Sequence, residues 1–120
     1  MTKLETLCEA IKTQEGWKKG SRSWRNNNPG NLKFSKYQRG HDGTFSVFES
    51  FSTGWLGLVF DIFSKCCGNT STKLNGESTL YELFEVWAPD NDGNNSKKYA
   101  ENVAKFCEVS PMTKLKEFLK

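Results

Sequence analysis

Glu15 is the acidic side chain whose neighbours best suit proton transfer. It is the one acid among the eight Lys and Arg residues that run from Lys12 to Arg39, and Trp17 and Trp24 follow it closely. A carboxylic acid that stays protonated can give its proton to a leaving oxygen, as the cleavage of a glycosidic bond requires. We expect the two tryptophans to shield this acid from water. On spacing alone, however, a solvated Glu near a helix end is the commoner situation.

The segment 26–31, with the sequence Asn-Asn-Asn-Pro-Gly-Asn, combines turn chemistry with amide side chains. Its Pro-Gly pair sets the backbone angles of a turn, and Asn28 or Asn31 can cap neighbouring amides. In a functional interpretation, Asn28, Asn31 and Arg25 hydrogen-bond the hydroxyl or N-acetyl groups of a sugar. Tyr99 can reach a cleft in the same way, although its helical spacing equally fits a core position. The sequence leaves both interpretations open.

Two helices are expected to position these residues. Apolar spacing predicts an amphipathic helix over residues 3–15, with Thr2 as its N-cap, so that Glu15 lies at its C-terminal edge. A second helix is predicted from Ser52, as N-cap, to a stop at Gly68. Apolar residues cover most of this second helix, which predicts a central and buried position.

The chain between these helices is predicted as a small β-hairpin lobe. Residues 21–43 are crowded with Asn, Gly, Ser and basic residues, which favours an ordered loop or hairpin and excludes a helix. Short strands are expected at 32–34 and at 44–48, the second preceded by an Asp42-Gly43 turn.

The C-terminal half is predicted to be helical. A capping box at 79–82 opens a helix that Pro89 closes, a further helix carries Tyr99, and Ser110-Pro111 starts the last one. The expected fold is therefore α+β and mainly α, with about five helices, in a single domain over residues 1–120.

Composition narrows the function classes. The longest apolar stretch is far shorter than a membrane span, and the first residues lack the features of a secretory signal. We therefore expect no membrane insertion, synthesis in the cytoplasm and free thiols at the four cysteines. No cysteine spacing resembles a zinc site and His41 is the single histidine, so we expect no metal and no organic cofactor.

The sequence resembles a compact lysozyme-like family of phages and bacteria that is related to goose-type lysozyme and soluble lytic transglycosylases. The resemblance spans about residues 5–107, and its Arg-Asn-x-Asn-Pro-Gly-Asn core is specific. The matching segments are Gln14-Glu15-Gly16-Trp17, Arg25 to Leu32, Phe45-Ser46-Val47-Phe48-Glu49 with Gly54, Trp87-Ala88-Pro89, Asn95, and Tyr99 to Val103.

The resemblance implies a lysozyme-like fold in which a helical lobe and a small β-hairpin lobe flank a groove for a glycan strand. It also implies that Glu15 is the general acid/base. A hydrolase of this kind uses a second carboxylate, for which Asp42 and Glu49 are the candidates, and Glu49 is the better placed. A lytic transglycosylase manages with one Glu, because the muramic hydroxyl of the substrate attacks and an anhydro product forms. Of the two reactions, we expect the lytic one.

The expected activity is therefore cleavage of the β-1,4 bond between MurNAc and GlcNAc in peptidoglycan glycan strands, by a monomer that acts at the cell wall during phage lysis or as a virion component. Two alternatives stay open. The first is a nucleic-acid-binding module, in which the basic segment 12–39 contacts phosphates and Trp17, Trp24, Phe34 and Tyr37 stack on bases. The second is a non-catalytic wall-binding or virion structural protein that keeps the fold.

Overall fold

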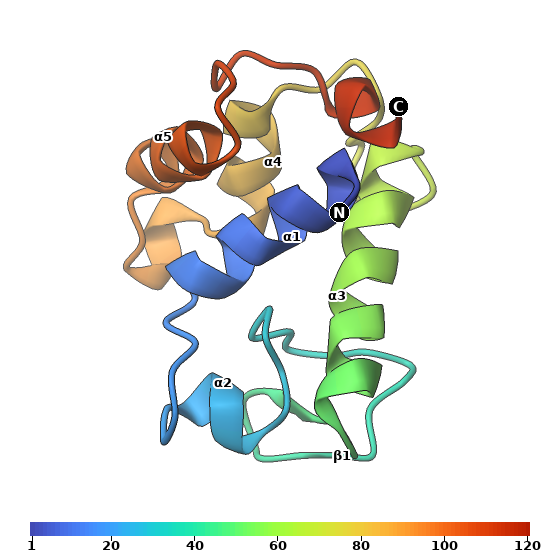
Figure 1. The fold of residues 1–120 in the computed structure, drawn as a ribbon, viewed down its shortest axis with the longest axis vertical. Coiled ribbons are helices and arrows are strands. Elements are labelled where there is room, and N and C mark those ends of the chain that lie inside the picture. Colours follow the sequence, from blue (N-terminus) through green and yellow to red (C-terminus); the bar gives the residue numbers. More distant parts are fainter.

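The computed structural model describes all 120 residues and confirms the predicted fold class, mainly α with a small β-hairpin. Figure 1 shows α1, α4 and α5 gathered in one lobe, α2 and the hairpin at the opposite end, and α3 running along both. No helix has the length and apolar character that a membrane crossing requires. The elements, in chain order, are α1 (Lys3–Gln14), α2 (Arg22–Arg25), β1 (Gly40–His41), β2 (Ser46–Val47), α3 (Phe51–Cys66), α4 (Leu80–Trp87), the 3-10 helix η1 (Asp90–Asp92), α5 (Ser96–Phe106) and the 3-10 helix η2 (Leu115–Leu119).

Helix α1 begins at Lys3, as the sequence predicts, and ends at Gln14, one residue earlier than expected. Thr2 and Glu5 form a capping box, in which each side chain accepts a hydrogen bond from the other residue's backbone N–H. Glu15 is the C-cap, and Gly16 follows it with a left-handed φ of 79°, which ends the helix. Glu15 therefore lies at the C-terminal end of α1.

The segment between α1 and α3 differs from the prediction in two places. The exclusion of helix from residues 21–43 is wrong at α2, where Ser21 caps a single helical turn by accepting from the Trp24 N–H. The strand predicted at 32–34 is also absent, because the partner of β2 is β1, joined to it through the 42–45 turn. Leu32 still accepts one backbone hydrogen bond from Ser46, at 2.9 Å.

Helix α3 is long, as the apolar pattern predicts, but the prediction that it is buried is wrong for one face, because Leu56, Phe60 and Phe63 are 52%, 43% and 44% exposed. It starts two residues earlier than expected, because Ser50 and not Ser52 is the N-cap, accepting from the Thr53 N–H at 3.2 Å. Its buried face contributes Leu58 and Ile62 to a core of apolar residues shared with α1, α4 and α5. None of the four cysteines is joined to another by a disulfide.

The C-terminal half confirms the capping box at Thr79 and Glu82 but not the last α-helix. The chain after Ser110 forms turns and the short η2, because its backbone is paired elsewhere: Leu115 donates to Ser78 at 2.8 Å, and Leu80 donates to Thr113 at 3.2 Å. A strand-like pairing of this kind prevents residues 111–114 from coiling into an α-helix. The count of five α-helices is therefore met, but with α2 in place of the expected terminal one.

The turn over residues 26–31 packs directly on the backbone of α3. A Cβ atom added at Gly54 would lie 1.7 Å from the carbonyl oxygen of Asn27 and 3.1 Å from Cδ of Pro29. Only a glycine leaves room for this contact. The same turn needs left-handed backbone angles at Asn27 and Asn31, a conformation that Asn tolerates better than most residues. The segment between α1 and α3, which we call the loop lobe, thus packs closely on the central helix at Gly54.

We predict that Gly54→Ala destabilises the fold, although alanine normally favours a helix interior. The overlap with the Asn27 carbonyl requires a backbone shift, whose expected cost is about 2 kcal/mol or more. Thermal unfolding measures it, with Gly40→Ala as the matched control, because a Cβ at Gly40 meets no atom within 4 Å. A Gly54→Ala protein as stable as the control would contradict this packing.

Candidate active site

A cavity of about 630 Å³ lies at the C-terminal end of α1, between the loop lobe and the helical lobe. The loop lobe contributes Asn31, Lys33, Phe34 and Phe45 to its wall. The other wall comes from α3 and from the end of α4 with the residues that follow, and its side chains are Asp61, Lys65, Val86, Trp87, Pro89, Asp92 and Asn94. Glu15 lies in the wall where the two sides meet.

The Glu15 carboxylate is held by hydrogen bonds from three neutral side chains. Oε2 accepts from the Tyr99 hydroxyl at 2.7 Å and from the Trp87 indole Nε1–H at 3.4 Å. Oε1 accepts from the Asn31 amide Nδ2–H at 3.3 Å, and the same amide donates to the Glu15 backbone carbonyl at 3.3 Å. These donors come from α5, from the end of α4 and from the 26–31 turn. Three segments besides α1 therefore fix the direction of one half-buried carboxylate.

Tyr99 was predicted as a substrate-binding residue, and the structure places its hydroxyl on Glu15. The ring is buried and packs against Phe84, with ring centroids 4.6 Å apart. Burial, and then the negative charge of Glu15, raises the pKa of Tyr99 well above its ordinary value. Tyr99 therefore stays a protonated donor to Glu15, and it combines the core position with the cleft position that the sequence left as alternatives.

The two asparagines of the turn have different environments. Asn31 lines the cavity and contacts Glu15, as a site residue would. Asn28 lies fully buried away from the cavity, where its Nδ2 donates to the carbonyls of Leu32 at 3.0 Å and Ser46 at 2.9 Å, and its Oδ1 accepts from the Leu32 N–H at 2.9 Å. The amide of Asn28 is thus used inside the fold, which supports the structural interpretation for this residue and not sugar binding.

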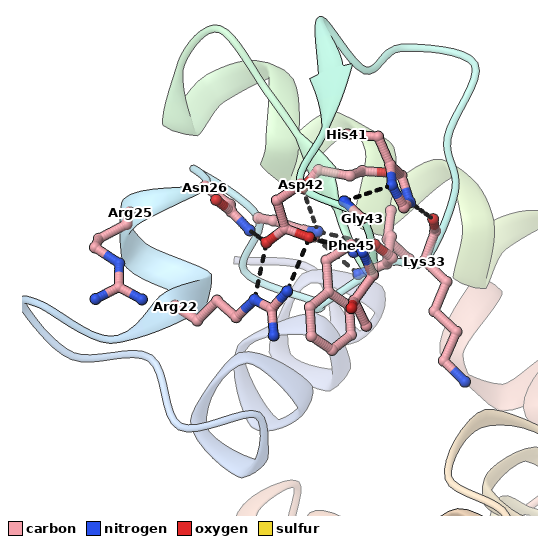
Figure 2. Close-up of polar contacts among 12 residues, drawn as sticks. Arg22, Arg25, Asn26, Lys33, His41, Asp42, Gly43 and Phe45 are labelled. Atoms are coloured by element: carbon pink, nitrogen blue, oxygen red, sulfur yellow. Dashed lines mark hydrogen bonds and ion pairs between the residues drawn. The ribbon is translucent and has the colours of Figure 1, made fainter.

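Arg25 and Glu49, the other predicted site residues, are exposed and do not line the cavity. Arg25 donates only to the carbonyl of Gly20, at 3.3 Å, and it points away from the polar contacts around Asp42 (Figure 2). Glu49 follows β2 and faces solvent. The structure does not bring either residue to Glu15.

Asp42, the alternative second carboxylate, organises the loop lobe. Its two oxygens accept from Arg22 at 2.8 and 3.0 Å, from Asn26 at 2.8 Å and from the backbone N–H groups of Thr44 and Phe45 at 2.9 and 2.8 Å (Figure 2). The Arg22 guanidinium, ahead of the other donors, holds the pKa of Asp42 well below its usual range. Asp42 therefore stays ionised, and its hydrogen bonds hold the loop lobe together.

The tryptophan that lines the cavity is Trp87, in place of the expected Trp17 and Trp24, and two charged residues of the wall, Asp61 and Lys65, were not predicted. Trp17 packs edge-on against Phe51 at 5.2 Å, Trp24 is 40% exposed, and neither lines the cavity, whereas Trp87 does. Asp61 and Lys65 form an ion pair in the cavity wall, one turn apart on α3. Charged residues four apart on a helix that is otherwise apolar are a signal that the sequence contains.

Ion pairs also engage part of the basic segment. Lys33 pairs with Asp92 at 3.2 Å, and this contact joins the loop lobe to the segment after α4 at the edge of the cavity. Lys12 pairs with Glu9 at 3.0 Å, and Arg22 pairs with Asp42. The positive charge of residues 12–39 is therefore partly neutralised within the fold.

The chain was compared with protein-family models, with curated proteins and with solved structures, and none of them matches it. No group of three or more His, Cys, Asp or Glu side chains is close enough to hold a metal ion.

We predict that Asn28→Ala is strongly destabilising, because it removes three buried hydrogen bonds to the backbone of Leu32 and Ser46, at an expected total cost of about 3 kcal/mol. Denaturant unfolding measures the loss. The matched control is Asn91→Ala, since Asn91 is exposed and makes no side-chain hydrogen bond. A change of stability similar to that of the control would refute the structural role.

Proposed function

We propose that this chain is a peptidoglycan-cleaving glycosidase of the lysozyme-like kind, with Glu15 as its general acid/base. The observation that carries the proposal is the setting of one carboxylate in the cavity wall, which three neutral donors orient and no cation pairs. The other acids of the cavity, Asp61 and Asp92, are ion-paired to Lys65 and Lys33. Glu15 is therefore the acid in this cavity that is available to exchange a proton with a substrate.

The hydrogen bonds to Glu15 favour one oxygen as the proton carrier. Oε2 receives the short bond from Tyr99 and a second from Trp87, so its lone pairs are occupied. Oε1 receives only the longer bond from Asn31, which leaves it the better site for the proton that passes to the leaving oxygen. Tyr99, Trp87 and Asn31 act on the reaction through Glu15, as positioning residues.

Among the possible reactions, the lytic one fits the site best. A hydrolase would use a second carboxylate in the cavity to activate water or to act as nucleophile. Neither Glu49 nor Asp42 lines the cavity, and the two carboxylates that do, Asp61 and Asp92, are engaged in ion pairs. In the lytic reaction the C6 hydroxyl of the muramic residue attacks C1 of the same residue, and the bond from C1 to O4 of the next glucosamine breaks. Glu15 gives its proton to that O4 and takes the proton of the attacking hydroxyl. One carboxylate suffices for both transfers.

The arrangement of aromatic residues argues against the nucleic-acid alternative. Stacking along a single strand requires side chains that present their faces along one groove. Trp17 contacts Phe51 in the first turn of α3, whereas Tyr37 contacts Phe60 more than two turns further along, each ring edge-on to its partner. The complete set of hydrogen bonds around Glu15 likewise favours an enzyme over a wall-binding protein without catalysis.

The test is digestion of purified peptidoglycan by the wild type, Glu15→Gln and Glu49→Gln, with the products identified by mass spectrometry. We expect the wild type to release anhydro-muramic ends and Glu15→Gln to lower their rate by about 100-fold or more, since it removes the acid/base. Glu49→Gln is the matched control and should cleave like the wild type.

The outcomes separate the alternatives. Reducing ends that depend on Glu15 would make the enzyme a hydrolase, with its water activated by another group. The absence of products on walls of several chemical types, or full activity in Glu15→Gln with an unchanged unfolding temperature, would overturn the proposal.

A further inference from the structure

A second, smaller cavity continues from the one that contains Glu15. Its volume is about 310 Å³, and the two cavities share Leu32, Phe34 and Asp61 in their walls. It lies between the loop after the 26–31 turn and the outer face of α3, next to the segment that follows that helix. Because the walls are shared, a substrate in the first cavity can extend into the second.

The second cavity presents a pair of aromatic rings and an unpaired cation. Tyr37 and Phe60 meet edge-on, with ring centroids 5.7 Å apart. The ammonium of Lys36 lies 4.5 Å from the Phe60 centroid and 5.2 Å from the Tyr37 centroid. Lys36 is exposed and forms no ion pair. An ammonium that lies over aromatic rings and forms no ion pair can bind an anionic group of a ligand.

The remaining polar groups of this cavity are compatible with an anionic ligand. The carboxylate of Asp61 would repel an anion, but Lys65 pairs with it and neutralises its charge. The Ser64 hydroxyl and the Asn69 amide face the same cavity and have no side-chain hydrogen bonds within the protein. They are free to donate to the carbonyl or carboxylate oxygens of a ligand.

From this arrangement we infer that the second cavity binds the acidic peptide stem of the substrate, with Lys36 pairing to a stem carboxylate and Phe60 packing against its short apolar side chains. The inference rests on the proposed function, because the stem is attached to the glycan that occupies the first cavity. A carboxylate-bearing peptide suits the cation better than a neutral sugar does, while the rings supply apolar contact for the alanine methyl groups. Stem recognition then makes Lys36 and Phe60 specificity-determining residues.

The experiment compares two substrates and two pairs of variants. The substrates are soluble glycan strands with intact peptide stems and the same strands after an amidase has removed the stems. Lys36→Gln and Phe60→Ala are the test variants. Lys105→Gln and Phe106→Ala are their matched controls, because both residues are exposed on α5 and line neither cavity. Unfolding temperatures verify that all four variants fold.

We expect the wild type and the controls to cleave strands with stems more efficiently, and each test variant to lose about 3- to 10-fold in kcat/KM on those strands, as removal of one partly exposed contact would cause. On strands without stems, the test variants should match the wild type. An equal loss on both substrates would mean that the cavity holds sugar, and no loss on either would mean that it holds nothing, so both results overturn the inference. If no strand is cleaved in a Glu15-dependent manner, the proposed function fails instead.

Discussion

The close approach of the 26–31 turn to the backbone of α3 is the constraint on which the rest of the site depends. Gly54 allows the Asn27 carbonyl to lie against the helix, at a distance that no side chain would permit. This contact fixes the height and direction of the turn relative to the central helix. Asn28 then ties the inner end of the turn to Leu32 and Ser46, and Asn31 at its outer end reaches Glu15. The absence of a Cβ atom at Gly54 therefore determines where Asn31, a hydrogen-bond donor to Glu15, is placed.

Glu15 is the point at which both lobes meet. The helical lobe supplies Tyr99 and Trp87, and the loop lobe supplies Asn31, so the orientation of the carboxylate reports on how the two lobes are placed. All three donors are neutral. They align the carboxyl group through hydrogen bonds alone, and no Lys or Arg forms an ion pair with it. The ion pairs of the cavity involve Asp61 and Asp92 and do not include Glu15.

Local signals in the sequence were sufficient for the features that depend on neighbours along the chain. The capping boxes at Thr2 and Thr79 and the stop at Gly16 are contained in a few residues each, and they locate Glu15 at a helix end. Helix α2 was missed because a single turn in a polar segment has no apolar period to detect. The last helix was predicted wrongly because pairing with a segment more than thirty residues away outweighs its local preference.

The residues around Glu15 are brought together by contacts between parts of the chain that are far apart in the sequence. For this reason the sequence predicts some of these residues and not others. Trp87 and Tyr99 contact Glu15 across 72 and 84 residues, and no spacing rule distinguishes the indole that does so from the three that do not. Asn28 and Asn31 have the same side chain within one turn, yet one is interior and the other is at the cavity. Only the path of the turn across α3 separates them.

The most direct test of this account is an NMR titration that follows the four tryptophan indole N–H signals while a chitin tetrasaccharide, a neutral chain of N-acetylated sugars, is added. The signals are assigned by substituting Phe for each tryptophan in turn. The account predicts a saturable shift of the Trp87 signal, because its indole lies in the cavity beside Glu15, and no shift of the exposed Trp24 signal. A response of Trp24 or Trp17 with Trp87 unchanged, or no response at millimolar sugar, would contradict the assignment of this cavity as the glycan site.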